Sequence, residues 1–206
     1  MISKAIILPL FAYFLGSVPW GVIFTRLFSD VNIQEAGSRN IGAYNVYRLA
    51  GKQLGIMTLV GDILKGVIPV LVAVCWVEIS DWKGELWVCL VALSAFTGHL
   101  FPVFFGFKGG KGVATAAGCV LIMSPLVFLV CVLVYILALC TTGYSSAGSL
   151  SAAAALPCGI WLGTHSVPLT GCAVLMAFLI FARHADNIRR LIDGTEHSSL
   201  SQKGKT

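Results

Sequence analysis

Residues 106–112 form a glycine- and lysine-rich segment between two strongly apolar stretches of the chain. Glycines allow several backbone N–H groups to crowd around one anion, and the two lysines add positive charge. Such a loop at a membrane surface suggests chemistry on a phosphorylated or phospholipid-related molecule. The simpler interpretation is a flexible basic loop that marks the inner side of a membrane. The segment lacks the P-loop pattern G-x-x-x-x-G-K-[ST], because Gly112 follows Lys111.

A second polar segment spans residues 37–48. It carries a hydroxyl, two amides and two guanidiniums, with glycines between them: Gly37, Ser38, Arg39, Asn40, Gly42, Asn45 and Arg48. Arginine suits bidentate binding of phosphate or carboxylate, and serine and asparagine can donate further hydrogen bonds. The segment is therefore another candidate anion site, and the alternative is a helix N-cap beside basic loop residues.

Two charged residues, Asp62 and Lys65, lie inside an apolar stretch, just before Gly66. They are three positions apart, so on a helix they share one face. Ionisable side chains within a membrane are costly, usually pair, and usually mark a function. We expect this pair to support the site, either by holding the helices together or by direct contact with a substrate.

Polar side chains gather again near the C-terminus, where His184 and Asn187 share one helix face and Arg190 follows. Histidine can act as an acid–base group and asparagine can orient a hydroxyl. The alternative is an amphipathic helix at the membrane surface. Further hydroxyl groups are clustered before an apolar stretch, with helix capping as the favoured interpretation: Tyr144, Ser145, Ser146 and Ser149.

Several common catalytic motifs are missing from the sequence. It contains no G-x-S-x-G element, and no set of cysteines or histidines has the spacing of metal ligands. None of the four histidines is followed by aspartate five positions later, which excludes the H-x-x-x-x-D acyltransferase motif. His99 alone is favoured as a structural, hydrogen-bonded histidine. We expect neither a metal nor a cofactor.

The composition identifies an integral membrane protein. Hydrophobic residues make up 57% of the 206-residue chain and charged residues only 11%, whereas soluble domains carry about 25% charged residues. The 14 basic residues exceed the 9 acidic ones. In a membrane protein this excess is first a signal of topology, so we expect no nucleic-acid partner.

A spanning helix needs about 20 apolar residues. The apolar stretches that meet or approach this length are 5–27, 54–77, 86–105, 113–141, 147–163 and 167–183. The fourth is too long for one helix and contains Ser124-Pro125, so we split it into 113–123 and 126–141. The prediction is an all-α bundle of seven transmembrane helices, some of them short. We expect residues 1–196 to form one membrane-embedded domain and residues 197–206 to be a disordered cytoplasmic tail.

The charges favour seven spans over six. With seven helices and an external N-terminus, 11 of the 14 basic residues fall on the cytoplasmic side: Arg26, Arg39, Arg48, Lys52, Lys108, Lys111, Arg183, Arg189, Arg190, Lys203 and Lys205. The loop with Glu78, Asp81 and Glu85 is acidic and falls outside. Six helices would place the tail opposite the two basic loops. We therefore expect the N-terminus outside and the C-terminus in the cytoplasm.

Together, and in this order, these segments resemble the bacterial membrane glycerol-3-phosphate acyltransferases that use acyl phosphate as donor. The resemblance covers about residues 15–196. It is carried by Gly37, Ser38, Asn40, Gly42, Ala43, Asn45 and Arg48, by Asp62, Lys65 and Gly66, by 108–115, and by His184, Asn187, Ile188, Arg190, Leu191, Gly194 and Glu196. Two positions depart from the family: Tyr44 replaces a small hydroxyl residue, and His197 replaces a frequent lysine.

The resemblance implies transfer of a fatty acyl group from acyl phosphate to the 1-hydroxyl of glycerol-3-phosphate, the first step of phospholipid synthesis. It implies a multi-pass enzyme of the bacterial cytoplasmic membrane with its active site at the cytoplasmic face. The partners are the two substrates and the lipid bilayer, with a soluble acyl-phosphate-forming enzyme as a further candidate. The implied catalytic residues are Ser38, Arg48, Lys111, His184 and Asn187. The implied substrate-binding residues are Asn40, Gly42, Asn45, Lys108, Gly109, Gly110, Gly112, Ser149 and Arg190.

Acyl phosphate is already activated, so no covalent nucleophile is needed. We expect direct attack by the glycerol hydroxyl, with a phosphate oxygen of the donor as base and His184 as the alternative base. Asn187 and Ser38 would orient the reactants, and Lys111 and Arg48 would stabilise developing charge. A small transporter for a phosphorylated solute is the alternative function. It is less favoured, because transporters place polar residues at the membrane midplane, and here only Asp62 and Lys65 lie deep.

Overall fold

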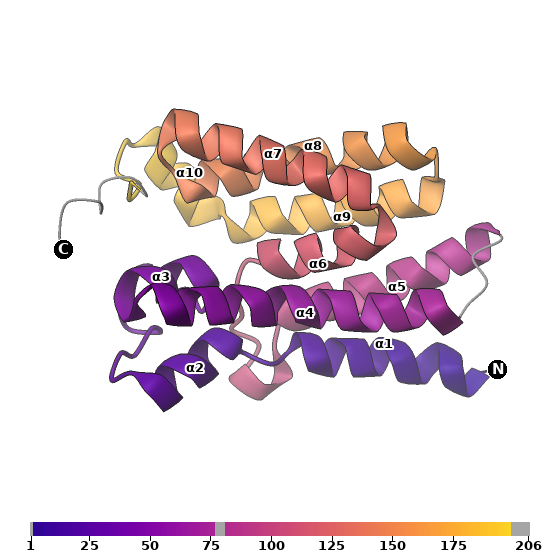
Figure 1. The fold of residues 1–206 in the computed structure, drawn as a ribbon, viewed down its shortest axis with the longest axis horizontal. Coiled ribbons are helices and arrows are strands. Elements are labelled where there is room, and N and C mark those ends of the chain that lie inside the picture. Colours follow the sequence, from indigo (N-terminus) through magenta and orange to yellow (C-terminus); the bar gives the residue numbers. More distant parts are fainter. Residues whose placement is uncertain (1, 77–80, 199–206) are drawn as a thin grey trace. The chain divides into compact units, whose positions relative to one another are not determined.

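The computed structural model describes residues 2–76 and 81–198, with side chains from residue 6 onward. Every regular element in these ranges is a helix (Figure 1), which confirms the all-α fold class. Glu78 of the acidic loop and residues 199–206 of the predicted tail lie outside the described residues. The chain divides into two compact units, Met1–Met123 and Ser124–Thr206.

The first unit is built around the long helix α4, Lys52–Trp76. The other elements of this unit are α1 (Ile2–Gly16), α2 (Trp20–Phe28), α3 (Ala43–Ala50), α5 (Trp82–Leu100), the short 3-10 helix η1 (Val103–Phe105) and α6 (Val113–Met123). Helix α4 contacts α1, α2, α3, α5 and α6, and α1 also packs along α5 (Figure 1).

Glycines let these helices approach closely. A side chain on Gly16 of α1 would collide with the backbone of Ala95 in α5, and one on Gly118 of α6 would collide with the backbone of Ile63 in α4. Small residues at helix crossings are typical of membrane proteins, where van der Waals packing drives helix association.

The span predicted over residues 5–27 is interrupted, because the chain bends by 40° between α1 and α2. Pro19 explains the bend, since proline has no N–H to continue the helical hydrogen bonds. The break also leaves the Val18 carbonyl available to another element. It accepts a hydrogen bond of 3.0 Å from Lys65 Nζ of α4.

The predicted break at Ser124-Pro125 is confirmed. Helix α6 ends at Met123, and α7 (Pro125–Thr142) begins at the proline with Ser124 as its N-cap. Proline is tolerated at the first position of a helix, where an N–H would have no intrahelical partner.

The second unit contains α7, α8 (Ser145–Thr164), α9 (Val167–Arg183) and the short helix α10 (Ala185–Ile192). Helix α8 packs against both α7 and α9. Residues in the left-handed conformation end two of these helices: Gly143 after α7, with φ 78°, and His165 after α8, with φ 51°. The chain bends by 60° between α9 and α10.

The apolar helices confirm an integral membrane protein. Helix α7 is apolar along nearly its whole length, yet only Val127 is buried, and large side chains such as Leu126, Leu129 and Leu133 are exposed. Within the described ranges, three stretches are long and apolar enough to cross a bilayer alone: Lys52–Trp76, Trp82–Phe105 and Pro125–Thr142. Counting the bent pairs α1–α2 and α9–α10 as one span each raises the number to five. The seven-span count and the orientation of the termini stay predictions.

Candidate active site

Asn45 organises the loop that precedes α3. Its side chain is buried, with the residue only 2% exposed. Nδ2 donates to the carbonyl oxygens of Asn40 at 2.9 Å, Ile33 at 3.3 Å and Ala36 at 3.4 Å. The amide therefore closes the loop onto the start of α3, which gives a structural task to a residue predicted to bind substrate.

The other end of the Asn45 amide brings Ser38 and Arg48 together. Its Oδ1 accepts from the Ser38 N–H and from the Arg48 guanidinium, each at 3.1 Å. Ser38 and Arg39 are exposed, and Arg48 is partly buried. Arg39 has a left-handed φ of 56°, which is strained for a residue other than glycine. Two predicted catalytic residues, Ser38 of the loop and Arg48 of α3, are thus held beside each other by one buried amide.

Gly42 is the N-cap of α3 and has an extended backbone, with φ −76° and ψ 162°. No side chain caps this helix end. Tyr44, one of the two departures from the family pattern, stacks its ring on Tyr47 at a centroid distance of 6.4 Å. Both tyrosines are exposed, so the larger residue at 44 is accommodated on the outer face of α3.

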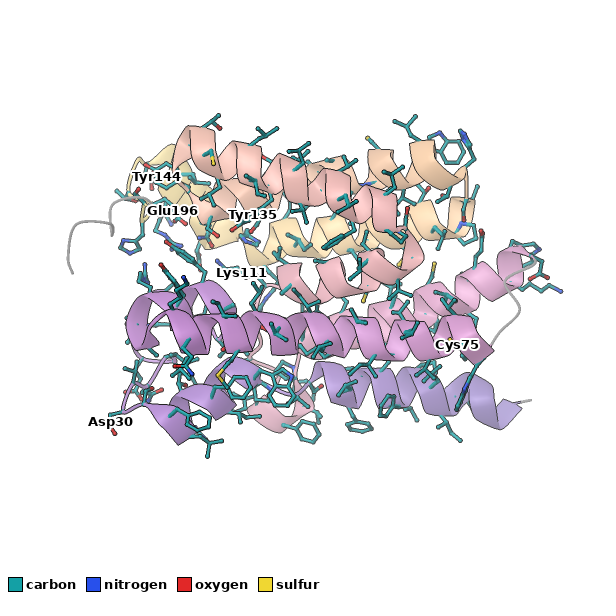
Figure 2. All side chains as sticks on the ribbon, viewed as in Figure 1. Asp30, Cys75, Lys111, Tyr135, Tyr144 and Glu196 are labelled. Atoms are coloured by element: carbon teal, nitrogen blue, oxygen red, sulfur yellow. The ribbon has the colours of Figure 1, made fainter. Side chains whose placement is uncertain are left out.

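The loop of residues 106–112 connects η1 to α6 in an unusual backbone conformation. Gly106, Phe107 and Gly112 have left-handed φ angles of 57°, 61° and 81°. Lys108 is exposed, whereas Lys111 is partly buried directly before α6 (Figure 2). Because the first N–H groups of a helix lack intrahelical partners, this end of α6 is suited to an anion.

The same loop is fixed to the end of α5. The Gly110 N–H donates to the His99 carbonyl at 3.1 Å. Gly109 lies so close to the carbonyls of His99 and Leu100 that a side chain there would collide with them. The two glycines are therefore required for the contact of the loop with α5.

Asp62, Lys65 and His99 form a buried polar cluster in the first unit. Lys65 Nζ lies 3.0 Å from Asp62 Oδ1 and donates to the Val18 carbonyl. His99 Nδ1 faces the same carboxylate oxygen at 3.6 Å. None of the three residues is more than 4% exposed. Lys65 thus pairs with Asp62 of its own helix and also ties α4 to the break between α1 and α2.

Glu196 is the centre of a polar cluster in the second unit, although we did not predict it as a site residue. Its Oε1 accepts from Asn187 Nδ2 at 2.6 Å and from Ser146 Oγ at 2.8 Å. Its Oε2 accepts from Arg190 Nε at 2.7 Å. Glu196 (Figure 2) thereby ties α10 to the first turn of α8. The sequence signal that could have identified Glu196 is its position at the end of the motif that begins at His184.

The surroundings of Glu196 favour its ionised form. Burial raises the pKa of this carboxyl group, but the hydrogen bonds from Asn187, Ser146 and Arg190, with the positive charge of Arg190, outweigh burial and hold the pKa below its usual value. Glu196 is therefore a carboxylate near neutral pH.

The hydroxyl groups at the start of α8 do not cap the helix, so the favoured capping interpretation is wrong. The N-cap is Tyr144, labelled in Figure 2, and it makes no side-chain cap bond. Ser146 instead reaches the carboxylate cluster, and the Ser145 hydroxyl pairs with that of Tyr135 at 2.8 Å. Ser149, predicted to bind substrate, is buried and donates to the Ser145 carbonyl at 3.0 Å.

His184 lies at the bend between α9 and α10 and is only 2% exposed. Its Nδ1 lies 2.8 Å from the Ile180 carbonyl oxygen. Since a carbonyl can only accept, Nδ1 carries the hydrogen, and the neutral ring keeps its lone pair on Nε2. This tautomer would allow Nε2 to accept a proton.

The structure thus places the predicted residues in three groups. The first combines Ser38 and Asn40 of the loop before α3 with Asn45 and Arg48 of α3 itself. The second is the loop 108–112 with the Asp62 cluster. The third is in the second unit, where Asn187 and Arg190 bond to Glu196, while Ser149 and His184 contact nearby backbone carbonyls. Throughout residues 2–76 and 81–198, no three His, Cys, Asp or Glu side chains converge as a metal site would require. Guanidinium, ammonium and backbone N–H groups dominate, which suits anionic substrates.

Comparison with known proteins points to one family. The family model described as Glycerol-3-phosphate acyltransferase matches residues 6–194. A curated glycerol-3-phosphate acyltransferase of Syntrophotalea carbinolica is 44% identical over 191 residues, which are 93% of this chain and 95% of that protein. Two crystal structures of PlsY (YgiH), an integral membrane glycerol 3-phosphate acyltransferase, are 39% identical, with 95% of each chain covered. The TM-score is 0.89 for the glycerol 3-phosphate form and 0.87 for the lysophosphatidic acid form.

Proposed function

Because the chain belongs to the glycerol-3-phosphate acyltransferase family, we propose that it transfers a fatty acyl group from acyl phosphate to the 1-hydroxyl of glycerol-3-phosphate. The products are lysophosphatidic acid and inorganic phosphate. The observation that carries the proposal is the glycine–lysine loop, which is fixed to α5 and places Lys111 at the N-terminus of α6. This arrangement offers an ammonium group and backbone N–H groups to a phosphate.

The proposed reaction is a direct transfer. The 1-hydroxyl oxygen of glycerol-3-phosphate forms a bond to the acyl carbonyl carbon, and the bond from that carbon to the phosphate oxygen breaks. The hydroxyl proton passes to the departing phosphate. Acyl phosphate is an activated donor, so orientation and charge stabilisation supply the rate acceleration without a covalent enzyme intermediate.

We assign the residues of the first unit to the two phosphate groups. Lys111 and the loop 108–112 bind glycerol-3-phosphate, and Arg48 stabilises charge that develops on the donor. Ser38, whose backbone is bound to Asn45 beside Arg48, orients the reacting groups. Asn45 acts by shaping this loop. Its Nδ2 donates to three carbonyls of the loop, and its Oδ1 accepts from the Ser38 N–H and from Arg48.

We assign Asn187 and His184 of the second unit to the same reaction on the strength of the family motifs, which lie in both units. Asn187 orients the substrate hydroxyl, and Glu196 fixes its amide. The donor phosphate is the proposed base. A His184→Gln variant with an unchanged pH profile of kcat supports the donor phosphate, whereas loss of one limb of that profile would identify His184 as the base.

We further propose that residues 1–196 act as one domain in the bacterial cytoplasmic membrane, with seven spans, an external N-terminus and the active site at the cytoplasmic face. Three lone apolar helices and two bent pairs support five of these spans by length and composition. Helices α6 and α8 would supply the other two. Cysteine-labelling of the acidic loop and of the 106–112 loop from each side of the membrane tests the orientation.

Release of phosphate tests the proposed function. Purified protein in detergent is given palmitoyl phosphate with or without glycerol-3-phosphate, and inorganic phosphate is measured. We predict release of phosphate only when both substrates are present. In Ser38→Ala and Lys111→Met the rate of release should fall about 100-fold or more, as expected when a group that stabilises a transition state is lost. Ser94→Ala is the control, because the Ser94 hydroxyl bonds to Leu90 of its own helix. A transporter for phosphorylated solutes would release no phosphate, which would refute the proposal.

A further inference from the structure

We infer that His99 is a positioning residue for the loop of residues 106–112, and that it acts on glycerol-3-phosphate binding without touching the substrate. The inference rests on the proposed function, since it takes this loop to be the glycerol-3-phosphate site. All of the contacts that support it lie within the first unit.

His99 touches the loop in two ways. Its carbonyl oxygen accepts the Gly110 N–H at 3.1 Å. Its imidazole lies directly against Gly110, so that a side chain at position 110 would collide with Nε2 of the ring. The imidazole is therefore the surface on which the loop rests, one residue before Lys111.

On the side away from the loop, the ring lies beside a buried ion pair. Nδ1 of His99 faces Oδ1 of Asp62 at 3.6 Å. The same oxygen lies 3.0 Å from Lys65 Nζ, and that ammonium also donates to the Val18 carbonyl. Asp62 and Lys65 are each only 2% exposed. The Asp62 carboxylate is therefore held by the Lys65 ammonium, which is itself anchored to the break between α1 and α2.

The contacts thus form a continuous path from Lys65 to Asp62, from Asp62 to the His99 ring, and from the ring to Gly110. A change at His99 would let the loop shift and so misplace Lys111 and the N–H groups beside it. Small displacements of a binding group weaken the interaction strongly, because the geometry of a charge-assisted hydrogen bond is narrow. Replacement of a residue that merely stabilised the fold would change the KM values of both substrates alike.

The first experiment compares the KM values of the two substrates. We predict that His99→Ala raises the KM of glycerol-3-phosphate about tenfold or more, the equivalent of one hydrogen bond to a charged group. The KM of palmitoyl phosphate should stay within about twofold, which is at or below the effect of an ordinary surface substitution. His99→Asn, which keeps a polar side chain between Asp62 and the loop, should recover part of the loss. His165→Asn is the matched control, since His165 is an exposed helix-terminal residue of the second unit.

A double-mutant cycle tests the contact between the ring and the glycine. Gly110→Ala in the wild-type protein should raise the KM of glycerol-3-phosphate, because the added methyl group meets the imidazole. In a His99→Ala background the ring is gone, and the same Gly110→Ala change should cost little more. Such non-additivity is the expected result for residues in direct contact. Gly171→Ala, with no atom near the added methyl group, controls for a glycine change elsewhere.

Calorimetric titration of glycerol-3-phosphate into the detergent-solubilised proteins repeats the comparison without turnover. Weaker binding in His99→Ala, partial recovery in His99→Asn and the non-additive cycle would support the inference. Equal losses for both substrates, or a Gly110→Ala cost that is the same with and without the ring, would overturn it. A wild-type protein that binds glycerol-3-phosphate but transfers no acyl group would instead refute the proposed acyl transfer, while the glycerol-3-phosphate site on which this inference rests would stand.

Discussion

The side-chain amide of Asn187 donates a hydrogen bond of 2.6 Å to Oε1 of Glu196. Because Nδ2 is the atom that faces the carboxylate, the direction of the amide is fixed. Ser146 of α8 donates to the same oxygen at 2.8 Å, so the position of Asn187 in α10 also depends on α8. The predicted catalytic asparagine is therefore oriented by a glutamate nine residues away in the chain.

Replacement of this carboxylate should reduce catalysis. In Glu196→Gln, one acceptor oxygen becomes an NH2 group that cannot accept from Arg190 or Asn187. We expect kcat to fall about tenfold or more, because a hydrogen bond to a charged group contributes ~1.5–3 kcal/mol. Asp193→Asn is the control, since the Asp193 carboxylate is exposed and pairs with Arg189 only at 3.9 Å. Wild-type kcat in Glu196→Gln would contradict the orienting role.

Glu196 should also make stability depend on pH in the acidic range. Its pKa in the folded protein lies below its usual value of 4.5, so the unfolded chain binds a proton more readily. The contribution of Glu196 to stability is therefore present above that usual value and is lost as the pH falls through the lower folded pKa. Thermal unfolding in detergent from neutral to strongly acidic pH should show a smaller acid-induced loss for Glu196→Gln than for the wild type. Parallel curves would refute this assignment.

Asn45 should tolerate neither loss of its amide nor a change to a carboxylate. Asn45→Ala removes the bonds to three carbonyls, and Asn45→Asp also sets a negative charge against those oxygens. We expect both to lower the melting temperature, with the aspartate variant the less stable. Asn32→Asp, in an exposed turn where only Oδ1 is bonded, should behave as the wild type. An Asn45→Ala protein as stable as the wild type would show that the three donor contacts are unimportant, and Asn45→Asp as stable as Asn45→Ala would contradict the added repulsion.

The packing of Gly109 predicts a large effect from one added methyl group. Gly109→Ala would drive a side chain into the carbonyls of His99 and Leu100. We expect the KM of glycerol-3-phosphate to rise about tenfold or more, as when a charge-assisted contact is lost. Steady-state kinetics at saturating palmitoyl phosphate measures this change, with Gly171→Ala as the benign control. A kinetically silent Gly109→Ala would mean that the loop does not need its observed contact with α5.

Arg39 provides a test of backbone strain beside Ser38. Its left-handed φ of 56° suits glycine and costs other residues on the order of 1 kcal/mol. Arg39→Gly and Arg39→Ala both lack the guanidinium, so a difference between them reports on the backbone alone. We expect the glycine variant to melt at the higher temperature. The reverse order in thermal unfolding would exclude strain at this position.

Local sequence patterns predicted the breaks and loops that depend on nearby residues. Ser124-Pro125 ends one helix and starts the next, as the loss of an N–H in proline requires. Pro19 produced a second break that we did not predict, because the apolar pattern continues through it. The grouping of Ser38 and Arg48 also followed from their closeness in sequence.

Contacts between distant residues could not be obtained in this way. Ser146 meets Glu196 across 50 positions, and Lys65 meets the Val18 carbonyl across 47. Both contacts depend on how helices pack, and no periodicity in the sequence records that packing. For the same reason, sequence patterns favoured helix capping for the serines of α8, which the structure does not show.

Acyl transfer with two donors tests the central claim most directly. The purified protein is given labelled glycerol-3-phosphate with either palmitoyl phosphate or palmitoyl-CoA, and labelled lysophosphatidic acid is separated and counted. We predict product from palmitoyl phosphate and none from palmitoyl-CoA. Product from palmitoyl-CoA would contradict the assignment of acyl phosphate as donor, and a folded protein that makes no product from either would contradict the proposed activity itself.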